Sequence, residues 1–232
     1  MANSIFNHPA FNIIGRPTMD DFLKRCSDRL GQFGLSQADI NDAIKQACDF
    51  FNIPMPRMIQ DLTNVQNGQT MFVNWDRGSY YDDVLCFNMQ QLIAMKVDSK
   101  SAFSLVMTHE CAHRVLQATR FPGVSNGIWE NELAADFLMG CRAGLWNMDD
   151  SKVCLGLSMT DGSPTHPDGS LRVLFIQHGK YVAQAMQSNG IPLTIQNLTN
   201  EFMAFREQNL ANILSLERRF YVFSGINGID FS

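Results

Sequence analysis

The sequence lacks the features of membrane-spanning, secreted and nucleic-acid-binding proteins. No apolar run approaches the roughly 18 residues that cross a bilayer, and residues 1–17 hold no basic stretch followed by an apolar one, as a cleavable signal peptide does. The Lys and Arg residues form no basic run and the formal net charge is −5, which disfavours a nucleic-acid surface. We therefore expect a cytoplasmic protein that has no membrane span and binds no nucleic acid. Secretion by a route without a cleavable signal stays open.

The cysteines lack any C-x-x-C pair and are irregularly spaced. Most of them sit in apolar patterns typical of helices or strands, so we interpret them as reduced core residues. Their even number leaves disulfides open, although a chain of this size does not need them to fold. The six cysteines are Cys26, Cys48, Cys86, Cys111, Cys141 and Cys154.

The length and composition predict one domain. With 232 residues, 45% of them apolar, the chain can bury one sizeable core and is too short for two comfortable domains. Turn-forming residues punctuate both ends. We expect an irregular N-terminal arm over 1–17, a single domain over 18–222 and a C-terminal tail over 223–232.

Helical spacing of apolar residues dominates the chain. Ser36, followed three residues later by Asp39, is a plausible N-cap, and Asp98 or Ser99 is expected to cap a later helix. Two short strands flank a turn-rich segment. The expected helices cover 18–33, 36–51, 92–95, 100–119, 129–146, 170–188 and 194–220, and the expected strands cover 71–73 and 84–87.

The pentapeptide His109-Glu110-Cys111-Ala112-His113 is the strongest functional motif. On a helix, positions i and i+4 lie one above the other about 6 Å apart, so His109 and His113 can bind one Zn²⁺. Glu110 lies about 100° further round, which keeps its carboxylate off the metal and places it to accept a proton from water. The alternative is a pair of satisfied core histidines. Because the helix over 100–119 is apolar nearly all round, these three polar side chains would be costly to bury without a metal.

A catalytic zinc site needs a third protein ligand, and the helix over 129–146 offers carboxylates. Glu132 and Asp136 are four residues apart on one face. Glu132 could bind zinc while Asp136 accepts the proton on the second nitrogen of a zinc-bound histidine and so fixes its tautomer. Glu130, which lies on a different face, is the competing ligand. Small residues on this helix are expected to let it approach the helix over 100–119 closely; they are Ala134, Ala135, Gly140, Ala143 and Gly144.

Three motifs in chain order make the sequence resemble the gluzincin metallopeptidases. They are His109-Glu110-x-x-His113, Glu132-x-x-Ala135-Asp136, and His166-Pro167 followed by Arg172. The resemblance covers about residues 84–182. The family it points to contains both integral-membrane prenyl-protein proteases and soluble neutral zinc peptidases. Because this chain has no membrane span, we expect the soluble, minimal form of the fold, and the prenylated substrates of the membrane enzymes do not carry over.

The resemblance implies a zincin-like fold and a role for each motif residue. Glu132 would be the third zinc ligand and Asp136 would support it from outside the ligand set. His166 would donate a hydrogen bond to the oxyanion, and Arg172 would pair with Asp136. From the residues alone, Thr165 is a candidate cap of the helix over 170–188, which would leave His166 in the preceding loop.

We therefore expect an α+β, zincin-like fold that is mostly helical, with a small β-sheet whose edge strand precedes the active-site helix. The strand over 84–87 could hold an extended peptide along that edge, although an ordinary hairpin fits the spacing equally well. The expected activity is that of a zinc metalloendopeptidase with one Zn²⁺, a peptide or protein substrate and Glu110 as general base. His166, Tyr80 or Tyr81 would stabilise the oxyanion.

Two other functions fit the motifs. One is a zinc-bearing, protease-like binding or regulatory protein without turnover. The other is a different zinc amide hydrolase, such as a deformylase, which would recruit a cysteine upstream of the pentapeptide as its third ligand. Cys86 is the nearby upstream candidate.

Overall fold

The structure is a computed structural model that describes residues 35–55, 58–61, 72–74, 84–87, 92, 97–119, 121 and 128–223. The expected N-terminal arm over 1–17, the expected helix over 18–33 and all of the expected tail beyond Phe223 lie outside these residues. By its internal contacts the chain divides into two compact units, Met1–Arg114 and Val115–Ser232. The single domain expected over 18–222 stays a prediction.

Helix α2 (Gln37–Phe50) opens the described part of the first unit. Ser36 caps it as expected: its Oγ accepts from the Asp39 N–H at 3.1 Å, and the Asp39 carboxylate accepts from the Ser36 N–H at 3.0 Å. This reciprocal pair satisfies two backbone donors that have no partner inside the helix. Lys100, at the start of α4, donates to Asp39 at 2.8 Å. The apolar face of α2 is buried through Ile40, Ala43, Ile44, Ala47 and Cys48.

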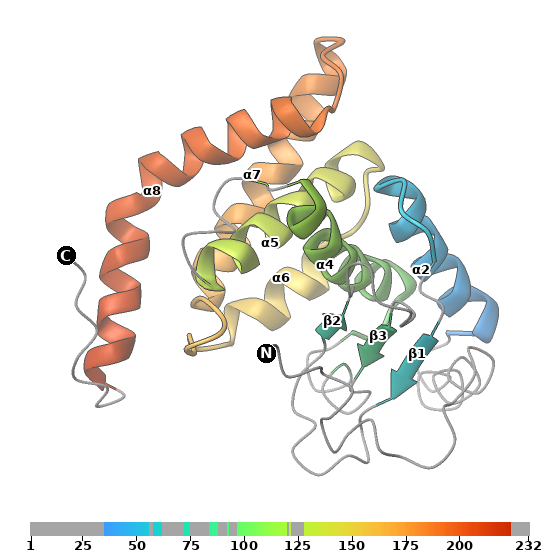
Figure 1. The fold of residues 1–232 in the computed structure, drawn as a ribbon, viewed down its shortest axis with the longest axis horizontal. Coiled ribbons are helices and arrows are strands. Elements are labelled where there is room, and N and C mark those ends of the chain that lie inside the picture. The colour runs from blue at the N-terminus through green and yellow to red at the C-terminus, as the bar shows by residue number, and fades with distance from the viewer. Residues whose placement is uncertain are drawn as a thin grey trace. The chain divides into compact units, whose positions relative to one another are not determined.

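Three short strands also belong to the first unit (Figure 1). They are β1 (Met58–Asp61), β2 (Phe72–Asn74) and β3 (Val84–Phe87), in the order β1-β3-β2. Strand β3 pairs with β1 in parallel and with β2 antiparallel. The strand that precedes α4 is therefore bonded on both sides and is not the edge strand that the sequence suggested.

The expected α+β class is wrong. Within the described part of the chain, every residue whose side chain is placed lies in a helix or in a segment next to one, and the core residues are helical or flank helices. The strands contribute only three or four residues each, with backbone alone described. The run over 84–87 does form β3 as expected, but strands of three or four residues make up little of the described fold beside helices such as α4 and α7, which have 20 residues each. An α-helical architecture is what the described core supports.

Helix α4 (Lys100–Thr119) is buried along most of its described length. Its first turn is capped by Ser99, whose Oγ accepts from the Ala102 N–H at 3.2 Å, and every residue over 102–112 is buried. The bounds match the expected helix. The helix continues without a break across Arg114, where the first unit ends.

In the second unit, α5 (Ile128–Leu145) and α7 (Gly169–Ser188) lie side by side (Figure 1). A Cβ on Gly140 would stand 2.0 Å from the Ile176 carbonyl oxygen, and one on Gly144 would stand 2.3 Å from that of Lys180. Only glycine allows the two backbones to come this close. The small residues were expected to face the helix over 100–119, but these two glycines face α7 instead.

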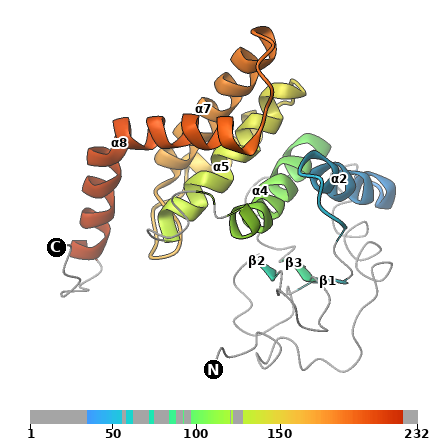
Figure 2. The same ribbon diagram turned by 45° about the horizontal axis from the view of Figure 1, so that its top comes forward.

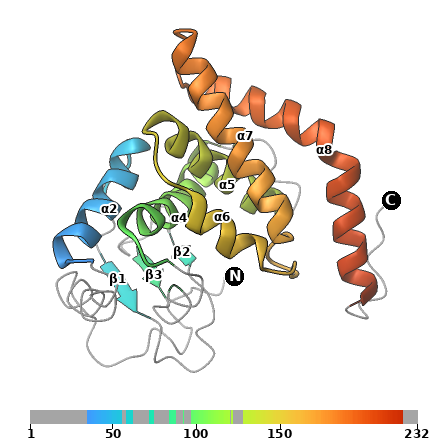
Figure 3. The ribbon, with the colours of Figure 1, turned by 180° about the vertical axis from the view of Figure 1, so that it is seen from behind.

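Helices α6 (Ser151–Ser158) and α8 (Ile195–Phe223) complete the second unit. Helix α6, which the sequence did not suggest, packs against α7 (Figure 3). The connection between α7 and α8 contains Gly190, at φ +66°. Figure 2 shows α8 leaving α7 at an angle. The fully buried Phe202 of α8 lies at the centre of an aromatic cluster, with ring centroids of Phe121, Phe137 and Phe175 at 5.5 to 5.8 Å.

Among the helices that the structure describes, none is long and apolar enough to cross a membrane.

Candidate metal centre

Helix α4 brings the two imidazoles of the pentapeptide together. The Nε2 atoms of His109 and His113 lie 3.2 Å apart, and the rings are perpendicular with centroids 4.8 Å apart. Two nitrogens bound to one tetrahedral zinc, each about 2.0–2.1 Å from the ion, lie roughly 3.3–3.4 Å apart. The spacing of this pair therefore already matches that of two ligands of one metal ion.

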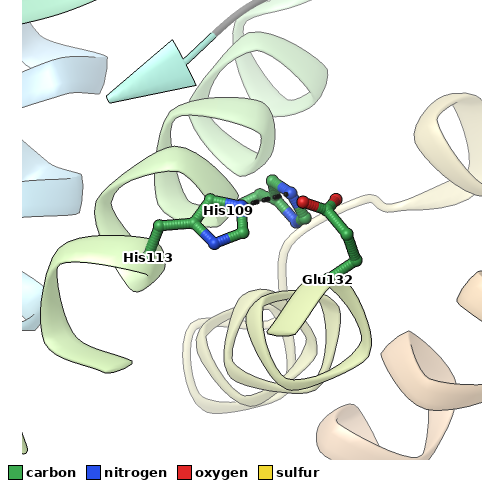
Figure 4. Close-up of side chains that lie close together, drawn as sticks. All are labelled: His109, His113 and Glu132. Atoms are coloured by element: carbon green, nitrogen blue, oxygen red, sulfur yellow. Dashed lines mark hydrogen bonds between the residues drawn. The ribbon is translucent and has the colours of Figure 1, made fainter. Parts of the chain in front are cut away.

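Glu132 of α5 is the candidate third donor. One ligand atom from each of His109, His113 and Glu132 lies within 4.8 Å of the other two (Figure 4). In the figure the Glu132 carboxylate points toward the two rings. Two imidazole nitrogens and one carboxylate oxygen are the donor set of many hydrolytic zinc sites, which keep a fourth position open for water or substrate.

Two cationic or protonatable groups of the second unit lie beside the Glu132 carboxylate. Oε2 of Glu132 is 3.7 Å from Nε2 of His166 and 3.8 Å from Nη2 of Arg172. The Glu132 side chain is mostly buried, with 13% of it exposed. Both side chains can orient the Glu132 carboxylate.

Arg172 of α7 also holds Asp136, as the resemblance implied. Its Nε donates to Oδ2 of Asp136 at 2.7 Å and its Nη2 donates to Oδ1 at 3.0 Å. Asp136 is fully buried, and such a two-point pair compensates much of the cost of burying both charges. Glu132 and Asp136 are one helical turn apart, so Arg172 can contact both. It therefore connects the candidate metal ligand Glu132 to the buried Asp136.

His166 lies in the loop between α6 and α7, where local hydrogen bonds set its ring. Its backbone N–H donates to Ser163 Oγ at 2.9 Å, its carbonyl accepts from the Ser163 N–H at 2.7 Å, and Nδ1 lies 2.9 Å from Thr165 Oγ1. Thr165 is not the cap of α7. That role falls to Asp168, whose side chain accepts from the Ser170 N–H at 2.9 Å.

The structure places Glu110 but not the tyrosine candidates for oxyanion stabilisation. Glu110 is on α4 beside His109 and is buried, with 6% of its surface exposed. Tyr80 and Tyr81 lie outside the described residues. For Cys86, which the deformylase alternative requires, the structure describes only the backbone within β3.

Glu130, the competing ligand, is engaged elsewhere in the second unit. Arg206 of α8 donates from Nε to Oε1 of Glu130 at 2.8 Å, and Nη2 of Arg206 contacts the same oxygen. Burial raises the pKa of the nearby Glu217, and the negative charge of Glu130 raises it further. The sequence did not identify Arg206 as relevant, because it lies in no recognisable motif.

Comparison of the chain with known protein families, characterised proteins and solved structures found no match.

Proposed function

We propose that the chain is a zinc-dependent metallopeptidase of the gluzincin type. The observation that supports this most is the 3.2 Å separation of the two imidazole nitrogens on α4, with the Glu132 carboxylate grouped beside them. A pair of core histidines without a metal has no need for a converging carboxylate. Three converging donors of the right kinds are what a catalytic zinc requires.

Zinc fits this donor set. His109, His113 and Glu132 would hold it, and their types are those of hydrolytic rather than structural zinc sites, which favour thiolates. When bound, zinc would supply Lewis acidity that polarises a carbonyl and lowers the pKa of water to about 7. The surrounding helix is buried, so water has limited access and charges interact more strongly than at the surface.

Glu110 would act as the general base. As the neighbour of His109 on α4, it sits about 100° round the helix from that ligand, which leaves its carboxylate free of the ligand set. It would accept a proton from the attacking water and then deliver it to the leaving amine. Proton transfer by a positioned side chain contributes typically 10²- to 10⁴-fold to a rate.

His166 and Arg172 would support the reaction from the other side of Glu132. If the Thr165 hydroxyl donates to Nδ1 of His166, the proton of the ring lies on Nε2, the atom that faces Glu132. That N–H could donate to a developing oxyanion. Arg172, bound to Asp136 and close to Glu132, would fix the position of the ligand carboxylate.

The proposed substrate is a peptide or protein, and the proposed location is the cytoplasm. Digestion of a peptide library followed by mass spectrometry tests the activity, and cell fractionation tests the location.

The decisive variant for the activity is Glu110→Gln, which keeps the size of the side chain and removes the base. We expect turnover to fall by about 10³-fold or more while the zinc content stays at one ion per chain. Glu201→Gln, an exposed glutamate on α8, is the matched control and should retain full activity.

Each other outcome contradicts part of the proposal. Unchanged hydrolysis by Glu110→Gln would exclude Glu110 as the base. A wild-type protein that binds zinc but cleaves no peptide would favour the binding or regulatory alternative. Cleavage of formylated peptides alone, with loss of zinc in Cys86→Ala, would favour the deformylase alternative.

A further inference from the structure

Two thiols touch on the side of α4 that lies away from the imidazoles. Sγ of Cys48, in the last turn of α2, is 3.8 Å from Sγ of Cys111. Cys111 is two residues from both His109 and His113, which places it about 200° round the helix from each. Both cysteines belong to the first unit, are free of disulfides and are buried, at 1% and 0% exposed.

The contact is close enough for a disulfide after a small movement. A disulfide has an S–S length of about 2.05 Å, so the two sulfurs would have to approach by about 1.8 Å. Cys48 lies two residues before the end of α2 at Phe50. Helix ends open more readily than helix centres, which gives a small reagent a route to a thiol that is otherwise buried.

We propose that Cys48 and Cys111 form a site of reversible oxidation, at which hydrogen peroxide joins them as a disulfide that weakens metal binding by α4. Its regulatory consequence rests on the proposed zinc site. One thiol sulfur attacks peroxide, breaking the O–O bond to give a sulfenic acid and one water. The second thiol sulfur displaces the sulfenic hydroxyl, which leaves with the thiol proton as a second water. Two thiols lose two electrons, and one peroxide is reduced to two waters.

The disulfide acts on the metal centre through the backbone of α4. A helix moves as a rigid element, so drawing residue 111 toward α2 displaces His109 and His113 together. Close-packed cores do not absorb such a shift continuously. Changes in the groups that support metal ligands typically cost 10- to 100-fold in metal affinity. By linkage, bound zinc must make the thiols harder to oxidise by the same factor.

The test treats the full chain with hydrogen peroxide, with and without bound zinc. After acid quenching, free thiols are alkylated in denaturant, and the digest is examined by mass spectrometry. We expect one bridged peptide pair that contains Cys48 and Cys111. We also expect zinc affinity, measured by competition with a chromogenic chelator, to fall by about tenfold or more and to recover with a dithiol reductant.

Variants separate the pair from other cysteines. Cys48→Ala and Cys48→Ser should both keep zinc affinity and lose its response to peroxide. Cys141→Ala is the matched control, because Cys141 is equally buried on α5, and it should keep the response.

Two results would overturn the proposal. One is oxidation of the less buried Cys154 without any Cys48–Cys111 bridge. The other is a bridge that leaves zinc affinity unchanged. A reduced protein that binds no zinc would overturn the metal centre and with it the regulation, whereas the bridged peptide would still report on the thiol pair by itself.

Discussion

Two carboxylates of α5 each pair with an arginine from another helix, and the two pairs differ in their neighbouring residues. Arg172 of α7 binds Asp136 through two hydrogen bonds, and Arg206 of α8 binds Glu130. All four side chains are largely buried. The Arg172 pair lies next to Glu132, a candidate metal ligand, with Nη2 of Arg172 3.8 Å from Oε2 of Glu132.

The Arg206 pair instead fastens α8 to α5. Its acidic neighbour is Glu217, whose pKa is raised by burial and by the charge of Glu130. The two glutamates therefore differ in the groups that surround them, and neither the residue type nor the spacing along α5 reveals that difference. Glu130 and Glu132 are two residues apart on the same helix, yet of the two only Glu132 has a ligand atom within 4.8 Å of those of His109 and His113.

The largest effect is expected from removing the two glutamates one at a time. Glu132→Ala should abolish stoichiometric zinc binding, because it removes one of three protein ligands. Glu130→Ala should leave zinc binding intact and lower the free energy of unfolding by about 3–5 kcal/mol, since Arg206 loses its buried partner and keeps only the contact with the exposed Glu207 among its described ion pairs. Elemental analysis and urea unfolding measure the two effects. Loss of zinc in Glu130→Ala with retention in Glu132→Ala would reverse the assignment.

Replacing each arginine should show that the two pairs differ in their effect on zinc affinity. Arg172→Met removes the two hydrogen bonds that Arg172 donates to the buried Asp136, and we expect a loss of about 3–5 kcal/mol in unfolding free energy together with about tenfold weaker zinc binding. Arg206→Met should lower stability alone. Zinc affinity is measured by chelator competition on both folded variants. Equal zinc affinities in the two would show that Arg172 does not position Glu132.

A smaller effect is expected at the contact between α5 and α7. Gly140→Ala would place a Cβ 2.0 Å from the Ile176 carbonyl oxygen, which forces the helices apart at a cost of about 1–3 kcal/mol. The Arg172–Asp136 pair spans these helices and should weaken, whereas the Arg206–Glu130 pair should not. Gly190→Ala serves as control, because nothing lies within 4 Å of its Cβ position and only the strain of φ +66° applies. Urea unfolding measures the stability of both variants. A Gly140→Ala variant as stable as wild type would contradict the expected loss.

The sequence predicted local features of the helices well and contacts between distant residues poorly. The Ser36–Asp39 cap and the bounds of α4 follow from interactions between neighbours along the chain. The partner of Glu130 is 76 residues away, and no local pattern marks Arg206. The cap of α7 shows the same limit, because Thr165 and Asp168 are both good capping residues and only the structure shows that Asp168 accepts the bond.

Architecture was harder to predict than the individual helices. The apolar segment over 84–87 suggested a sheet edge, but β3 is paired on both sides and the described core is helical. Gly140 and Gly144 marked a close helix contact correctly, yet their spacing along α5 does not identify the partner. That choice depends on which helix presents a matching backbone, as α7 does at Ile176 and Lys180.

The smallest expected effect is a dependence of stability on pH near the Arg206 side of α8. His178 of α7 stacks on Phe205 with ring centroids 3.7 Å apart, and burial lowers its pKa below the ordinary 6.5 although the charge of Glu201 opposes this. The unfolded chain therefore binds the proton more readily than the folded chain. This contribution to stability is complete above pH 6.5 and declines as the pH falls from there toward the lower pKa of the folded state.

Urea unfolding of wild type and His178→Phe between about pH 8 and 5 measures the contribution of His178 to stability. Glu217, whose raised pKa makes stability increase as the pH falls, is present in both proteins. Its effect therefore cancels in the difference between their unfolding free energies. Wild type should lose stability relative to the variant as the pH falls. A difference that stays constant with pH would show that His178 titrates alike in both states.

X-ray absorption at the zinc edge of the zinc-loaded protein is the most direct test of the proposed metal centre. We expect one ion per chain with two imidazole nitrogens at about 2.0–2.1 Å, at least one carboxylate oxygen and no sulfur. A sulfur scatterer at about 2.3 Å, or a protein that retains no zinc after loading, would contradict it.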